Sequence, residues 1–281
     1  MRDTIEITMF SDAPRFYRPC APLNEFVACF WHFRTYPGAH KRERALPTGT
    51  MELVVNLDEG RMRIFADDED RIGQWYDDAV VCGPHSRYFV LDTSDSRPVV
   101  GVHFRPGGAR PFLGVRADEL RDRHAALEDL WGPFAREFRE RLIQASPADM
   151  FRLLESVLLS RLRLSSLPHP VVRYAVRELS MSQTVAHVHQ VQKATGYGAK
   201  RFIELFSGSV GLTPKVFSRV RRFQGVIHRA ARGRHVEWAR VAADSGYCDQ
   251  SHLNREFRNF SGITPALYRP VSEARPSHVA V

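Results

Sequence analysis

The sequence predicts an α+β multidomain protein, in which a β-rich N-terminal domain precedes an all-α domain of two helix-turn-helix units joined by a linking helix. Three observations lead to this fold class. Short apolar or alternating runs fill the first third of the chain. One helix-turn-helix pattern occurs twice in the last third, and the excess of basic residues coincides with it.

The N-terminal part has the composition of short strands. Six runs are apolar or alternate between apolar and polar residues, and polar clusters separate them, which is typical of antiparallel strands. They comprise residues 25–33, 51–57, 62–65, 79–82, 87–92 and 98–104. The pattern predicts a small antiparallel barrel or sandwich.

After Phe104 the pattern changes to helices. Ser146 and Pro147 provide a cap and a first-turn proline, and the helix that follows has a broad apolar face. This face comprises Met150, Leu153, Leu154, Val157, Leu158 and Leu162. We expect it to pack on the strands, and a pairing surface between two copies of the chain is the alternative. Residues 165–170, SSLPHP, interrupt the pattern and divide the chain into predicted domains at 1–165 and 171–270.

The stretch VAADSGYCDQSHLNREFRNFSGITP, near the C-terminus, has the pattern of a helix-turn-helix. Gly246 permits a sharp turn, and Asp249 can cap the second helix. In that helix Leu253 and Phe257 are four residues apart and form an inward face. Another face carries polar side chains, namely Ser251, Asn254, Arg255 and Arg258.

The same pattern occurs about fifty residues earlier, which makes it an internal repeat. The matching positions are Gly196 with Gly246, Phe202 with Leu253, Phe206 with Phe257, Gly211 with Gly262, and Thr213-Pro214 with Thr264-Pro265. Gly211 and Gly262 can each end a helix, and the Thr-Pro pair after each of them can begin the next one. Between the copies, apolar residues at helical spacing predict the linking helix, namely Val216, Val220, Phe223 and Ile227, before Gly233 ends the run.

The net charge is divided unevenly along the chain. Residues 171–281 contain 17 Lys plus Arg and 7 Asp plus Glu, a net charge of +10, and the rest contains 23 and 25, a net charge of −2. A basic surface that coincides with helix-turn-helix units indicates binding to phosphates, because each neutralised phosphate releases counterions. A merely solvated basic surface is the alternative.

Residues 246–265 resemble the signature of the AraC family of transcription regulators. The resemblance covers residues 171–268. It implies a sequence-specific regulator that binds double-stranded DNA, with RNA polymerase as a further partner if it activates transcription. Gln192 departs from the family pattern, because its counterpart in the second unit is the small Ala242.

The N-terminal half resembles the domain of unassigned function that precedes one AraC-type subgroup. The similar blocks are LPTGTMELVVN, CGPHSRYFV, GVHFRPGGARPFLG and LEDLWG. The resemblance implies a β-rich, cupin-like domain that senses a small molecule or mediates homodimerisation, with the effector unknown. Thr48 stands where that subgroup usually has an aspartate.

The helix faces predict the residues that contact DNA. In the second unit these are Ser251, His252, Asn254, Arg255 and Arg258, and the matching places of the first unit hold Lys200, Arg201, Ile203 and Glu204. Arg255 is the strongest candidate for reading a base, because an arginine can meet both acceptors of a guanine. We also expect Lys215 and Arg222 to contact phosphates.

An enzyme is the alternative class. His103, His85, His32 and Glu52 suggest a metal site, since many cupins combine histidines with a carboxylate, and the alternative is a metal-dependent cupin-like enzyme with a DNA-binding appendage. However, cupin metal sites usually take an H-x-H pair, and residues 102–104 read VHF. We therefore expect no catalysis, metal or cofactor. An architectural DNA-bending protein is the third reading.

The remaining observations concern the compartment. The first twenty residues lack an apolar run of signal length, and eighteen consecutive apolar residues occur nowhere. The four cysteines show no C-x-x-C pairing. We expect a cytoplasmic protein with no membrane association.

Overall fold

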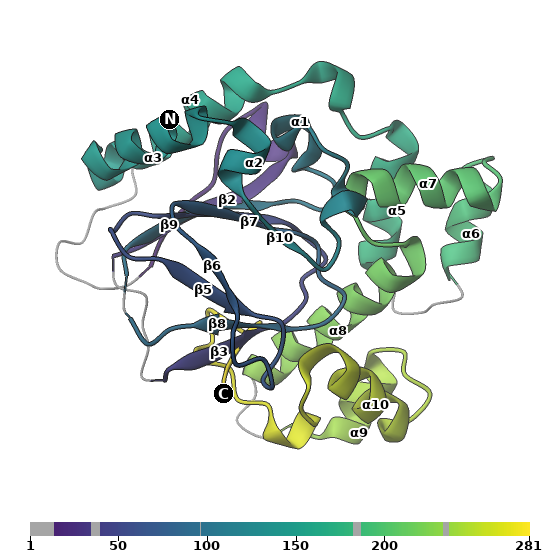
Figure 1. The fold of residues 1–281 in the computed structure, drawn as a ribbon. Helices are drawn as coiled ribbons and strands as arrows, with labels where there is room; N and C mark the ends of the chain where they lie inside the picture. Colours follow the sequence, from purple (N-terminus) through teal and green to yellow (C-terminus); the bar gives the residue numbers. More distant parts are fainter. Residues whose placement is uncertain (1–13, 35–39, 96, 182–186, 233–235) are drawn as a thin grey trace, which may run out of the picture.

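The structure is a computed structural model that describes residues 14–34, 40–95, 97–181, 187–232 and 236–281. A β-rich part with two sheets is followed in the chain by a helical part that lies beside it (Figure 1). The predicted α+β multidomain fold class is therefore confirmed.

Antiparallel pairing joins the strands of both sheets. The larger sheet has the order β1 (Arg15–Tyr17), β2 (Val27–Phe33), β9 (Val99–Phe104), β4 (Glu52–Asn56), β7 (Ala79–Cys82) and β10 (His124–Ala126). The smaller sheet has the order β11 (His278–Ala280), β3 (Arg42–Ala45), β8 (Phe89–Asp92), β5 (Met62–Phe65) and β6 (Gln74–Tyr76). Val80 and Cys82 of the larger sheet pack with Ile64 and Tyr76 of the smaller one.

All six predicted strands form, as β2, β4, β5, β7, β8 and β9. The sequence did not reveal β1, β6, β10 and β11, because three residues are too few to show an alternation. It did not reveal β3 either, since its sequence RERA is charged. Glu43 and Ala45 of β3 are nevertheless buried.

Short helices cover the larger sheet. They are α1 (Arg110–Leu113), α2 (Leu127–Trp131), α3 (Phe134–Gln144) and α4 (Pro147–Arg161). Ser146 caps α4 by accepting a hydrogen bond from the amide of Asp149, as predicted. Met150, Leu154, Val157 and Leu158 are buried in one core with the strands. The prediction that α4 packs on the β-domain is therefore confirmed, and this face is not free to pair two copies.

The helical part begins at α5 (Pro170–Met181), and the proposed domain boundary precedes it. The first unit comprises α6 (His187–Ala194) and α7 (Ala199–Val210), the linking helix is α8 (Pro214–Arg232), and the second unit comprises α9 (Trp238–Asp244) and α10 (Gln250–Ser261). Gly211 and Gly262 end α7 and α10 in the left-handed conformation, at φ 87° and 74°. Gly233 lies outside the described residues. The helix predicted to begin at Thr264 is only a three-residue 3-10 turn, η4 (Pro265–Leu267), and Thr264 makes no side-chain cap.

The C-terminal strand returns to the β-domain. β11 pairs with β3, and the buried Glu43 of β3 forms ion pairs with Arg275, His278 and His40. Burial raises the pKa of Glu43, but the hydrogen bond and charge of His278 and the charge of Arg275 outweigh it and lower that pKa to about 2. A buried ionic cluster therefore ties the end of the chain to the smaller sheet.

This buried ionic cluster makes the free energy of unfolding depend on pH in the acid range. The Glu43→Gln variant should lose about 3 kcal/mol of unfolding free energy at pH 7, because Arg275 keeps its buried charge without a counter-charge. The pKa of Glu43 in the folded protein lies below the ordinary 4.5. The ionised Glu43 therefore stabilises the wild-type protein above pH 4.5, and this stabilisation is lost as the pH falls towards 2. Urea unfolding across this range checks it. The exposed Glu137→Gln variant should have the unfolding free energy of wild type across this range. If Glu43→Gln is as stable as wild type at pH 7, the proposed role of Glu43 is wrong.

Candidate DNA-binding interface

The second unit forms the predicted turn between α9 and α10. The amide of Tyr247 donates to the carbonyl of Ala242 over 3.0 Å, and Gly246 takes a φ of 70°. The Oδ1 atom of Asp249 accepts from the amide of His252 over 2.6 Å and caps α10. Local sequence signals therefore place the start of this recognition helix.

The two faces of α10 are divided as predicted. Leu253 and Phe257 are fully buried, and the buried Glu256 pairs with Arg219 of α8 at 2.8 Å. Polar side chains lie on the opposite face, where Ser251, Arg255 and Arg258 are exposed and Asn254 is half-buried. The structure therefore brings these four residues together on one accessible surface.

His252 does not lie on this exposed face of α10. Its ring lies edge-on to that of Tyr247, with 5.3 Å between centroids, and its Nδ1 atom accepts from the amide of Cys248 over 3.4 Å. The side chain is half-buried against the turn. His252 therefore supports the turn, a role that the helical spacing alone did not reveal.

The first unit presents α7 in the same way. Phe202 and Phe206 are buried, whereas the predicted set of Lys200, Arg201, Ile203 and Glu204 is exposed. Arg201 and Glu204 form an ion pair at 3.0 Å. Gln192 donates to the carbonyl of Tyr197, so this departure from the family pattern bridges the turn between α6 and α7.

Arg222 corrects an expectation from the sequence. It is only 8% exposed, donates to the carbonyl of Gly246 over 3.0 Å and lies 4.6 Å from the ring centre of Tyr247. The expectation that Arg222 contacts phosphate was wrong, because α8 is buried against both units and this side chain supports the second turn. Lys215 is exposed, as that role requires.

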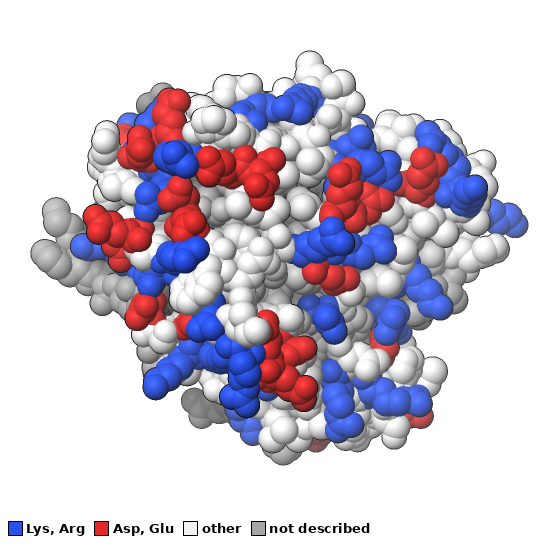
Figure 2. Space-filling model, in the orientation of Figure 1, with Lys and Arg blue, Asp and Glu red and all other residues white. Residues whose placement is uncertain are grey.

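The surface charge follows the helical part. Blue side chains lie over the region where Figure 1 places α6, α7, α8 and α10, with fewer red ones among them (Figure 2). α7 and α10 pack at different places along α8, against Phe217 and Phe223. Basic side chains therefore gather over the helical part on the face that Figure 2 shows.

The N-terminal domain contacts both recognition helices at their ends. Arg121 donates to the carbonyl of Gly211 over 2.6 Å, and a Cβ atom on Gly211 would lie 2.1 Å from Pro84. The amide of Tyr88 donates to the carbonyl of Phe260 over 2.9 Å, and its ring lies against Gly262. Equivalent glycines of the repeat are therefore both docked on loops of the N-terminal domain.

The four candidate metal residues do not gather at one site. His103 pairs with Glu52 at 2.6 Å, whereas the ring of His85 lies 4.6 Å from that of His124. Over the ranges that the structure describes, no three His, Cys, Asp or Glu side chains could hold a metal ion. No described helix is long and apolar enough to cross a membrane.

A cavity of about 520 Å³ lies in the β-domain beside the loops that contact the recognition helices. His85, His124 and Tyr76 line it, and their Nε2, Nε2 and Oη atoms are buried without a hydrogen-bond partner in the described part of the chain. Burial lowers the pKa of His85 to about 4 and lowers that of His124 well below its usual value, so both rings are neutral at pH 7.

Comparison with protein families accounts for both parts of the chain. Residues 191–270 match a family described as a helix-turn-helix domain, and residues 15–126 match a domain of unknown function (DUF6597). The chain therefore carries an AraC-type helix-turn-helix domain behind a domain of unknown function. As the sequence of the repeat implies, the chain is a DNA-binding transcription regulator.

Curated protein sequences give no match to this chain. Among solved structures, ToxT from Vibrio cholerae O395 is similar at 11% identity and a TM-score of 0.46, over 85% of this chain and 96% of that one. A structure of unsaturated fatty acid bound wild-type ToxT from Vibrio cholerae strain SCE256 is similar at 10% identity and a TM-score of 0.44, over 85% and 94%.

The position of Arg222 gives a stability test. Arg222→Ala should lower the unfolding free energy by about 2 kcal/mol, because it removes a hydrogen bond from a charged donor and a cation–π contact. The exposed Lys215→Ala should change it by less than roughly 0.5 kcal/mol. Thermal and urea unfolding of both variants measure this, and an Arg222→Ala protein as stable as Lys215→Ala would show that Arg222 does not support the turn.

Proposed function

We propose that this protein is a sequence-specific transcription regulator that reads two half-sites, one with each recognition helix. The observation that carries the proposal is the presence of two exposed, polar helix faces, on α7 and α10, which pack at different places along one helix, α8. Lys215, exposed on α8, is proposed to contact the phosphate backbone.

In the second half-site, α10 supplies the base-reading residues. Arg255 is proposed to donate to both acceptors of a guanine, and Asn254 to an adenine, because these are the usual partners of the two side chains in the major groove. Ser251 and Arg258 flank them and are proposed to contact base edges or phosphates. His252 is also proposed to belong to the DNA-contacting set, at the edge of the same groove, while its ring packs against Tyr247 and supports the turn.

The first half-site is proposed to be read differently. Its helix presents Ile203, which is 44% exposed and can touch a thymine methyl group. Glu204 can accept from a cytosine amine, but Arg201 already pairs with it, so base contact competes with this ion pair. Lys200 is proposed to add a phosphate contact. The two halves of the operator are therefore expected to differ in sequence.

The N-terminal domain is proposed to modulate DNA binding. Its cavity is of a size that small ligands occupy, and loops beside it contact Gly211 and Gly262 at the ends of both recognition helices. A small-molecule effector is therefore the proposed signal. Homodimerisation through this domain, and contact with RNA polymerase in an activator, are further proposals.

The assignment of Arg255 can be tested on operator variants. Arg255→Ala should weaken binding and relax the preference at one base pair by about 1 to 3 kcal/mol. Lys215→Ala should instead weaken binding evenly across sequences, because phosphates carry no sequence information. The measurement is the affinity of each variant for a panel of single-base operator changes at fixed salt. If Arg255→Ala keeps the wild-type ranking of every operator, Arg255 does not read a base.

The two-unit arrangement predicts the extent of protected DNA. Recognition helices that enter successive major grooves on one face of DNA read half-sites roughly 34 Å apart. A hydroxyl-radical footprint of the full chain should therefore span more than one helical turn. Protection limited to a single half-site would show that only one unit binds.

A further inference from the structure

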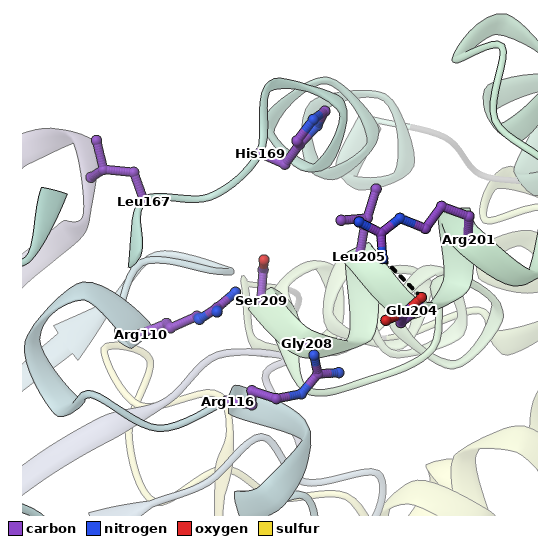
Figure 3. Close-up of a pocket in the computed structure, with 9 residues that line it drawn as sticks. All are labelled: Arg110, Arg116, Leu167, His169, Arg201, Glu204, Leu205, Gly208 and Ser209. Carbon is purple, nitrogen blue, oxygen red and sulfur yellow. Dashed lines mark hydrogen bonds and ion pairs between the residues drawn. The ribbon is translucent and has the colours of Figure 1, made fainter. Parts of the chain in front are cut away.

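A hollow of about 290 Å³ lies where the N-terminal domain meets α7 (Figure 3). Arg110 and Arg116 approach it from the N-terminal domain, and Arg201 approaches it from α7. The three guanidinium groups are turned towards the same space, which Ser209 borders, and the ring of His169 lies across it (Figure 3). Arginines from two domains therefore converge at this place.

The arginines that line the hollow have N–H donors without an acceptor. Glu204 is the lining acid and pairs with Arg201. Arg116 pairs with Asp118 through two hydrogen bonds, of 3.0 and 2.8 Å, and a guanidinium has five N–H donors. The side chain of Arg110 has no hydrogen-bond or ion-pair partner within the described ranges. The site therefore holds more positive charge than its own acids neutralise.

Gly208 allows this arrangement. A Cβ atom at Gly208 would lie 2.8 Å from Nη2 of Arg116, so the glycine lets this guanidinium of the N-terminal domain lie directly on α7. The contact places a cation of one domain against the recognition helix of the other. A ligand of these arginines would thus contact both domains.

We propose that this hollow binds a phosphoryl group, held jointly by Arg110, Arg116 and Arg201. Guanidinium groups match the oxygens of such an anion through paired hydrogen bonds, and the volume suits a small anion rather than a drug-sized molecule. The group comes either from the DNA backbone beside α7 or from a free phosphate compound. Only the DNA source rests on the proposed function.

The test compares Arg110→Gln with Arg152→Gln in the full chain. The Arg110 side chain makes no hydrogen bond or ion pair within the described ranges, and Arg152 is an exposed arginine of α4. The two variants therefore remove the same charge inside and outside the hollow. Unfolding midpoints of both variants should equal that of wild type. This first measurement confirms that later differences concern binding.

One arm titrates inorganic phosphate without DNA by calorimetry, at constant ionic strength. If a free phosphate compound is the natural ligand, wild type and Arg152→Gln bind phosphate, and Arg110→Gln binds it about tenfold more weakly. Chloride and acetate at the same ionic strength serve as reference anions. Equal, weak heats for all anions would exclude this source.

The other arm measures DNA affinity against salt concentration. If a backbone phosphate occupies the hollow, Arg110→Gln lowers the slope of log affinity against log salt by about 0.9 relative to Arg152→Gln, because one phosphate contact is lost. The proposal is overturned if Arg110→Gln matches Arg152→Gln in both arms. If wild type binds no DNA, the proposed function fails, and the phosphate titration then decides the proposal about the hollow alone.

Discussion

The burial of helix α8 fixes the relative placement of the two recognition helices. Phe217 of α8 packs against Phe206 of α7 with 5.5 Å between ring centroids, and Phe223 packs against Phe257 of α10 at 5.2 Å. The helix has 19 residues and is therefore about 28 Å long. Because Phe217 and Phe223 are fully buried, neither unit can rotate on α8 without opening an aromatic core.

The same helix also joins the units to the β-domain. Gln224 of α8 donates to the carbonyl of Pro47 over 2.7 Å, and Phe217 lies against Gly49. Docking of the N-terminal loops on Gly211 and Gly262 adds a second set of contacts. A helix that ends in glycine has no Cβ at that point, so a loop can approach its backbone closely. The internal repeat therefore supplies two equivalent docking points, and the N-terminal domain uses both.

Features with a local cause could be predicted from the sequence. The caps at Ser146 and Asp249 and the turn at Gly246 need only their own segments, and the inward faces of α4 and α10 follow from helical spacing. Contacts between distant segments could not be predicted. Glu43 lies in a charged strand, yet it is buried because the C-terminal strand brings Arg275 and His278 to it.

A charged residue in the interior misled the sequence interpretation for the same reason. Arg222 has the character of a surface residue, and only the carbonyl of Gly246 and the ring of Tyr247 explain its burial. The hollow of arginines between the domains also required the fold, since Arg110 and Arg201 are far apart in the chain. By contrast, the exposed set on α10 followed from the position of Leu253 and Phe257 alone.

The two recognition helices are not coupled equally to the N-terminal domain. α10 contacts it at its C-terminal end, through Tyr88. α7 contacts it there through Arg121 and again along its side, where Arg116 lies on Gly208. A movement of the N-terminal loops would therefore act on α7 through two contacts, at Gly208 and Gly211, and on α10 through the contacts of Tyr88. We infer that a signal from the N-terminal domain acts more strongly on the first unit than on the second.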